Sequence, residues 1–177
     1  MSSTFKDDFL KPFLVLVIIC IVASALLAAT NAMTADVIAA NEKAAMEATR
    51  REVLPGSESF EEIAAEEIAG VDSIYKESTG LGYVITARSK GYGGDVIVTV
   101  GIDARGQIVG VKANVSTETQ GVGTKAAKAE YLAQYMGDPA NAENAELITS
   151  ATFSSTAVKT SVNAAIAAYN TACKEAQ

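Results

Sequence analysis

One long apolar run dominates the first part of the chain. Residues 12–35 carry no charge, and the first half of the run is packed with Phe, Leu, Val and Ile. Because about 20 apolar residues cross a bilayer core, we expect a transmembrane helix over residues 12–34. A cleaved signal peptide is the alternative, but its apolar core is roughly 7–15 residues long and therefore shorter than this run. A lipid anchor on Cys20 is a further alternative, although the bulky Ile19 precedes it where a small residue is needed.

Strong helix formers continue beyond the apolar run as far as Leu54, where Pro55-Gly56 provides a stop. We therefore expect a helical extension over residues 35–56 that continues the membrane helix. Basic residues flank both ends of the apolar run, so charge alone does not orient it. Because a long following segment can be exported largely regardless of its charge, we expect a single-pass helix with residues 1–11 as a short cytoplasmic tail.

The remaining residues, 57–177, have the pattern of a separate domain. An acidic stretch at 59–70 places apolar residues at helical spacing and predicts an amphipathic helix. Runs rich in β-branched and aromatic residues then alternate with glycine turns, which is typical of an antiparallel sheet. The strands are expected over residues 71–78, 82–90, 95–103 and 107–115, and two later helices over residues 124–136 and 155–173. Strands flanked by helices indicate an α+β domain.

Composition narrows the chemistry available to this domain. The chain has 177 residues, no His and no Trp, and its two cysteines, Cys20 and Cys173, stand far apart. Neither a Cys/His metal site nor an imidazole-based triad can be built from such a set, so we expect no metal and no catalytic residue. The formal net charge of −7 makes nucleic acid a poor partner.

A hydroxyl-rich stretch directly precedes the last predicted helix. Residues 149–156 contain six hydroxyl side chains in eight positions. Helix N-termini expose unpaired N–H groups and a positive dipole end, so small hydroxyl residues there can hold a phosphate. The simpler alternative is that Ser154 or Ser155 is an N-cap, but a cap needs only one hydroxyl.

A second loop, residues 118–125, also leads into a predicted helix. Its glycines, Gly121 and Gly123, would let a ligand approach the backbone closely. The loop does not match the nucleotide-binding pattern GxxxxGK[ST], because Thr124 precedes Lys125. The alternative is a glycine turn with Thr124 as the N-cap. Two donor-rich loops entering two helices could nevertheless frame one anionic ligand.

The glycine-rich segment 90–94 is first of all a predicted hairpin turn, since glycine permits positive φ. Tyr92 stands in the middle of this turn. A role for Tyr92 against a planar ligand is the functional alternative.

Several of these segments resemble one family. Residues 146–152, ELITSAT, resemble the flavinylation motif DxxS/TGAT of the FMN-binding domain of RnfG and NqrC proteins, whose last Thr carries the flavin. The strand region KGYGGDVIVTVGIDARGQIVGVKA and the loop ETQGVGTKA are similar to that family's central strands and to its ETPGLGTK loop. With the N-terminal anchor, the resemblance covers nearly all of the chain, and its short length favours RnfG. The departures are Glu146 for Asp, Ser150 for Gly, Gln120 for Pro and Val122 for Leu.

The resemblance implies a covalent cofactor. The Thr152 hydroxyl would form a phosphoester with FMN, which a flavin transferase of the ApbE type installs from FAD. The same resemblance places the two predicted loops around the flavin, one at the ring and one at the phosphate. The implied contacts are Glu118, Thr119, Gly121, Val122, Gly123 and Thr124 near the ring, and Thr149, Ser150, Ala151 and Ser155 near the phosphate.

The family also implies a place in a larger assembly. It indicates an electron-transfer subunit of the Rnf complex, which passes electrons from ferredoxin to NAD⁺ while moving Na⁺ or H⁺. The implied partners are the other Rnf subunits, an ApbE-type transferase and membrane lipid, with the FMN domain at 57–177 on the extracytoplasmic side of the cytoplasmic (inner) membrane. Two alternatives stay open, an NqrC-like subunit of a Na⁺-translocating NADH:quinone reductase and a non-redox membrane-anchored binding module.

Overall fold

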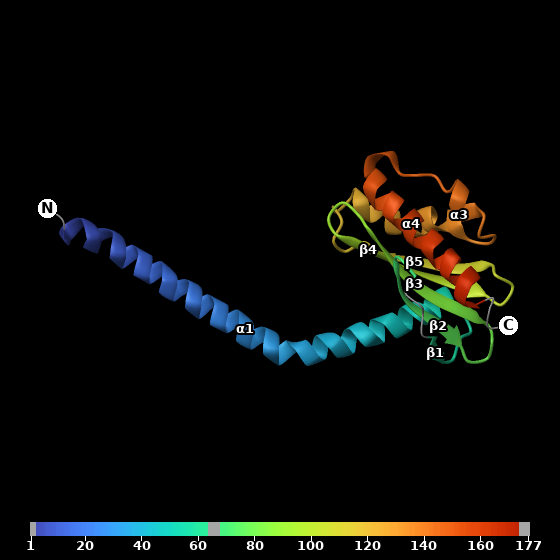
Figure 1. The fold of residues 1–177 in the computed structure, drawn as a ribbon, viewed down its shortest axis with the longest axis horizontal. Helices are drawn as coiled ribbons and strands as arrows, with labels where there is room; N and C mark the ends of the chain where they lie inside the picture. Colours follow the sequence, from blue (N-terminus) through green and yellow to red (C-terminus); the bar gives the residue numbers. More distant parts are fainter. Residues whose placement is uncertain (1–2, 64–67, 174–177) are drawn as a thin grey trace. The chain divides into compact units, whose positions relative to one another are not determined.

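The computed structural model describes the backbone of residues 3–63 and 68–173, with side chains described over residues 10–63 and 68–171 (Figure 1). The chain divides into two compact units, Met1–Met46 and Glu47–Gln177. The first unit is helical throughout its described length. The second unit contains a sheet and shorter helices, so the predicted α+β class is confirmed.

The N-terminal helix, α1, spans Ser3–Val53 without interruption. Among the described residues it is the one helix that is long and apolar enough to cross a membrane, with a mean hydropathy of 2.9 in its most apolar window. Its apolar side chains there are exposed, and Cys20 among them is a free, exposed cysteine. The predicted continuous helix is confirmed, and it ends just before Pro55-Gly56, where Gly56 takes a φ of 89°.

The sheet has five strands in the order β1-β2-β3-β4-β5, and every neighbouring pair is antiparallel. The four strands expected from the pattern are confirmed with ends that shift by at most a residue. The strands are β1 (Phe60–Ile63), β2 (Val71–Glu77), β3 (Gly82–Lys90), β4 (Asp95–Asp103) and β5 (Ile108–Asn114).

The helix predicted over 59–70 is wrong for every described residue of this stretch, which is strand over 60–63 and not helical at 59 and 68–70. Residues Phe60–Ile63 form β1, which pairs with β2 so that Phe60 lies opposite Glu77. The helical spacing of apolar residues was real, but β2 has unpaired backbone groups along its free edge, and pairing with them outweighs the weak intrinsic helix preference. Residues 64–67 lie outside the described part of the chain.

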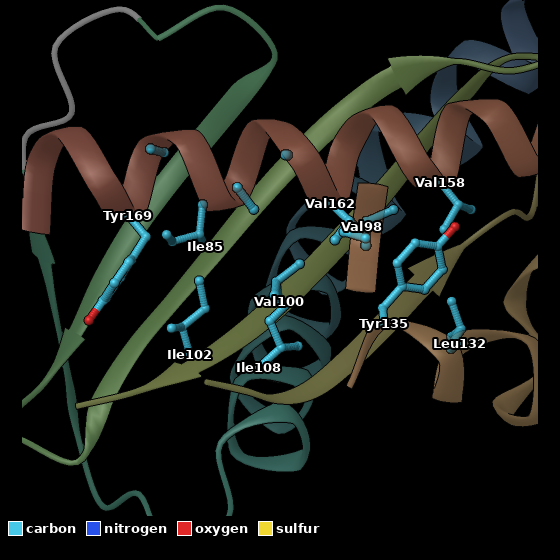
Figure 2. Packing of buried hydrophobic residues seen from close by; sticks show 14 of the residues in the cluster. Ile85, Val98, Val100, Ile102, Ile108, Leu132, Tyr135, Val158, Val162 and Tyr169 are labelled. Atoms are coloured by element: carbon cyan, nitrogen blue, oxygen red, sulfur yellow. The ribbon is translucent and has the colours of Figure 1, made fainter. Parts of the chain in front are cut away.

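One face of the sheet is covered by α4 (Thr152–Ala168), which lies across β3 and β4 (Figure 1). Val162 of α4 lies beside Val98 of β4, and Val158 lies beside the ring of Tyr135, all in one buried cluster (Figure 2). Tyr135 closes one end of this core; it is fully buried, and burial together with the Tyr131 hydroxyl raises its pKa well above the usual value. This helix therefore owes its position to apolar packing on the sheet.

The remaining helical predictions need correction. The expected single helix at 124–136 is broken into short pieces, because Lys128 takes an extended conformation with a ψ of 139°. Leu132 is buried as expected, whereas Ala129, Ala133 and Met136 are exposed and Tyr135 takes the inner position. The pieces are η1 (Gly123–Ala127), α2 (Ala129–Leu132), η2 (Ala133–Tyr135), α3 (Asn141–Asn144) and η3 (Thr149–Ala151).

The last helix begins earlier than predicted, at Thr152 in place of Ser155. It passes into a π-helical turn, η4 (Tyr169–Cys173), and the side chain of Cys173 lies outside the described part of the chain.

The other face of the sheet receives the last turn of α1. Adjacent strand residues point to opposite faces, so Ile85 joins the α4 core while Val84 packs with Val53 and Leu54. Gly101 and Gly110, opposite each other on β4 and β5, leave room for the Val53 backbone: a Cβ on Gly110 would lie 2.2 Å from the Val53 carbonyl oxygen.

Replacing Gly110 tests this packing. We expect Gly110→Ala to lower the free energy of unfolding by about 2 kcal/mol, because the added Cβ overlaps backbone atoms that cannot rotate away. Lys112→Ala on the same strand is the matched control. It removes only the exposed ion pair with Glu52 and should cost at most about 1 kcal/mol. Urea unfolding of the two variants measures the difference, and equal costs would contradict the close backbone approach.

From the hydrogen bonds of Glu77 in the turn between β2 and β3, we expect the folding stability to depend on pH in the acid range. The Thr79 hydroxyl donates to the buried Glu77 carboxylate at 2.6 Å, and together with the backbone N–H groups of Leu81, Thr79 and Glu58 it holds the pKa of Glu77 below its usual 4.5. A lowered folded-state pKa stabilises the protein above pH 4.5, and this contribution disappears as the pH falls through the folded value. Glu77→Gln should therefore flatten the acid limb of thermal stability; an unchanged limb would show that other carboxylates cause it.

Candidate functional site

Three segments that are distant in sequence meet around one cavity of about 290 Å³. The first is the turn between β3 and β4, closed by a hydrogen bond from Gly91 N–H to the Gly94 carbonyl, which confirms the predicted hairpin. The second is the loop after β5, and the third is η3 with the first turn of α4. The cavity is lined by Tyr92, Glu118, Thr119, Val122, Gly123, Thr149, Ser150, Ala151, Thr152, Phe153 and Ser154.

Glu118 connects these three segments. Its Oε1 accepts a hydrogen bond from Gly93 N–H at 3.0 Å, and its Oε2 accepts one from the Ser154 hydroxyl. Only 5 % of Glu118 is exposed. A buried carboxylate is tolerated only where such donors replace water, so these bonds fix the relative positions of the turn, the loop and the helix.

Glycines make room for this carboxylate. A Cβ on Gly91 would lie 2.4 Å from Oε1 of Glu118, and one on Gly123 would lie 2.7 Å from the Ser154 hydroxyl and 2.8 Å from Oε2 of Glu118. The expectation that Gly123 gives a ligand close access to the backbone therefore needs correction, because protein atoms fill the space beside its Cα. Gly121, with a φ of 73° and no neighbour within 4 Å of a Cβ position, serves the turn.

The loop after β5 is closed by hydrogen bonds to the carbonyl of Thr119, which accepts from Val122 N–H and Gly123 N–H. Thr124 lies inside η1, and its hydroxyl accepts a hydrogen bond from Gly121 N–H at 2.9 Å. The alternative that Thr124 is an N-cap is therefore wrong, because Val122 occupies that position. This geometry leaves Val122 partly exposed at the cavity.

The hydroxyl-rich stretch divides into structural and cavity-facing groups. Ala151 occupies the N-cap position of α4 without a side-chain bond, so the alternative that Ser154 or Ser155 is the N-cap is wrong. Ser155 is fully buried; its hydroxyl donates to the Ala151 carbonyl at 2.9 Å and accepts from Ile148 N–H at 3.1 Å. Thr152 is exposed at the first position of α4 and donates to the Thr149 carbonyl at 3.3 Å.

Ser150, which stands where the resembled motif has Gly, is accommodated without strain. None of the described non-glycine residues has a positive φ, so the serine occupies ordinary backbone geometry. Its side chain is exposed and contributes to the cavity wall beside Thr149 and Ala151.

The structure thus brings most of the predicted ligand residues together and leaves some aside. Gly121, Thr124 and Ser155 do not line the cavity. The sequence did not lead us to include Phe153 and Ser154 among the ligand contacts. A ligand role for Tyr92 was only one of two alternatives. Tyr92 and Phe153 are 75 % and 70 % exposed, with ring centroids 6.3 Å apart, and large exposed aromatic residues beside a cavity indicate a ligand or partner surface. The missed signal was an aromatic residue inside a hydroxyl-rich stretch.

Two family models and several known proteins are similar to this chain. Residues 91–167 match the family model described as the FMN-binding domain, and residues 10–53 match that of the RnfG N-terminal region. A relative from Acetobacterium woodii, the G component of its Na⁺-translocating ferredoxin:NAD⁺ oxidoreductase complex, is 32 % identical over 190 residues, covering 91 % of each chain. The chain belongs to the RnfG family.

Other RnfG relatives match over most of their length. The G component of the proton-translocating ferredoxin:NAD⁺ oxidoreductase complex of Clostridium ljungdahlii is 26 % identical, covering 85 % of this chain and 86 % of the relative. The G component of an ion-translocating oxidoreductase complex of Shewanella baltica is 24 % identical over 75 % of this chain and 70 % of the relative. The stretch that matches the FMN-binding domain contains every residue that lines the cavity.

Substitution of Ser155 tests its assignment as a structural residue. We expect Ser155→Ala to lower the free energy of unfolding by about 1–3 kcal/mol, because Ile148 N–H loses its buried acceptor. The neighbouring, exposed Thr156 offers the matched control, since Thr156→Ala removes a hydroxyl that faces solvent. Chemical denaturation distinguishes the two variants. If both cost the same, the buried bridge made by Ser155 does not stabilise the turn.

Proposed function

We propose that this chain is a membrane-anchored electron-transfer subunit of an Rnf-type ferredoxin:NAD⁺ oxidoreductase complex that carries FMN as a phosphoester on Thr152. The observation that carries the proposal is the position of the Thr152 hydroxyl. It stands exposed at the start of α4, on the wall of a cavity that is shared with the glycine-rich turn and the loop at 118–123.

The chemistry of the cavity fits the two ends of FMN. Thr149, Ser150 and Thr152 supply hydroxyl groups around the start of a long helix, where a phosphate is favoured by the helix dipole. Tyr92, Phe153 and Val122 supply exposed apolar surface suited to a planar ring system. When bound, the flavin supplies the redox chemistry, and the protein supplies position and electrostatics.

Thr152 would supply the covalent attachment of the cofactor. The Thr152 Oγ1 would form the bond to phosphorus, and the proton of its hydroxyl would leave. An ApbE-type transferase would break the phosphoanhydride bond of FAD in the same reaction, with AMP as the other product. Thr152 is suited to this reaction because its side chain is exposed and makes only a long hydrogen bond to the Thr149 carbonyl.

The anchor supports a place in the membrane. Helix α1 provides the apolar length for one span, and residues 10–53 match the RnfG N-terminal region. We propose that residues 1–11 lie in the cytoplasm, that residues 12–34 cross the membrane with lipid around them, and that the domain after the 35–56 extension lies outside. The other subunits of the complex would pass electrons to and from the bound flavin and move Na⁺ or H⁺.

Flavin attachment can be tested on a denaturing gel. After co-expression with an ApbE-type transferase, we expect a fluorescent band and a mass increase of one FMN, and Thr152→Ala should abolish both because the only attachment oxygen is gone. Thr160→Ala, an exposed threonine further along α4, is the matched control and should keep the label. Retention of the label in Thr152→Ala, or an unlabelled native chain, would contradict the proposal.

A further inference from the structure

We propose that the Glu118 carboxylate is a fixed negative charge that lowers the reduction potential of the flavin held in this cavity. This inference rests on the proposed function, because it takes the cavity as the flavin site. The observations behind it are the burial of Glu118, the nature of its two hydrogen-bond donors and its place in the cavity wall.

The Glu118 carboxyl group has a hydrogen-bond partner at each of its oxygen atoms. Both oxygen atoms accept: Oε1 from Gly93 N–H and Oε2 from the Ser154 hydroxyl. Ser154 lies in the first turn of α4, where the positive end of the helix dipole attracts negative charge.

Ion pairing of Glu118 decides how much of its charge is compensated. Within the described parts of the chain, Glu118 forms no ion pair with a lysine or arginine. Its two hydrogen-bond donors are neutral groups, so neither of them cancels the charge of the carboxylate. The glycines at positions 91 and 123 bring backbone and carboxylate together so closely that a side chain at either position would displace the carboxylate.

A fixed charge at this place acts on reduction. Electrons added to a flavin ring raise its negative charge or require protons to neutralise it, and a carboxylate in the same cavity disfavours the added charge. The effect is larger than at the surface, because a charge screened from water interacts through a lower effective dielectric constant. A purely structural Glu118, which only joins three segments, would leave the potential unchanged when its charge alone is removed.

The test uses the flavinylated full-length protein in detergent, titrated with dithionite and mediator dyes while the flavin absorbance is followed. Glu118→Gln keeps the shape, since its amide oxygen can accept from Gly93 N–H and its amide nitrogen can donate to Ser154. We expect its midpoint potential to rise so that the reduced-to-oxidised ratio at a given potential increases about tenfold, which is about 30 mV for a two-electron couple.

A second variant moves the potential in the opposite direction. Ser154→Ala keeps the charge and removes one of its two compensating donors, so the midpoint potential should fall. Glu130→Gln, at an exposed position of α2, removes one negative charge at the surface and should leave the potential unchanged.

The outcomes separate this inference from the proposed function. A labelled Glu118→Gln with the potential of the native protein would overturn the inference, and so would an upward shift in Ser154→Ala. If Glu118→Gln fails to fold or to take up flavin, Ser154→Ala decides alone: a downward shift supports the fixed charge and an unchanged potential contradicts it. An unlabelled native chain, by contrast, contradicts the proposed function itself.

Discussion

The cavity of this protein depends on the hydrogen bonds of one buried carboxylate. Glu118 joins Gly93, which is 25 residues earlier in the chain, to Ser154, which is 36 residues later. Through these two bonds, a side chain of the loop after β5 contacts both the hairpin turn and the start of α4. The glycines around Glu118 serve the same contact, because any side chain at 91 or 123 would occupy the space of the carboxylate or its partner. The three segments that carry the cavity-lining side chains are thus held together through one buried carboxylate.

Both faces of the sheet are covered, one by α4 and the other by the last turn of α1. On one face, valine and isoleucine side chains of β3 and β4 pack against α4 and hold the start of that helix at the cavity. On the other face, the paired glycines of β4 and β5 admit the last turn of α1. Arg50 adds to this contact by placing its guanidinium 3.5 Å from the centre of the Tyr75 ring. The end of the anchor helix is therefore packed against the sheet itself.

The sequence predicted those elements whose local pattern and tertiary role agree. The strands β2 to β5 combine β-branched residues with glycine turns at their ends, and the structure places them as expected. Thr149, Ser150 and Thr152 also come together with Glu118 and Thr119 as expected. In each of these cases the residue type and its position before a helix or between strands suffice to indicate the structure.

The failures have a common physical origin, since each depends on a partner that is distant in sequence. Phe60–Ile63 forms a strand because β2 offers an edge, which helical spacing cannot reveal. The breaks at Lys128 and Met136 occur where Leu132 and Tyr135 reach the core from separate short helices. Ser154 looked like a capping residue, yet its hydroxyl serves Glu118, and nothing in the local pattern around either residue signals that bond.

Site mapping by mass spectrometry tests the central claim most directly. Trypsin cleavage after Lys128 and Lys159 releases one peptide, residues 129–159, that contains the whole hydroxyl-rich stretch. Fragmentation of this peptide from the flavinylated protein should place the mass of FMN on Thr152, with Thr149, Ser150, Ser154, Ser155 and Thr156 unmodified. A flavin mass on any of those neighbouring residues, or on a different peptide, would contradict the proposal that Thr152 carries the FMN.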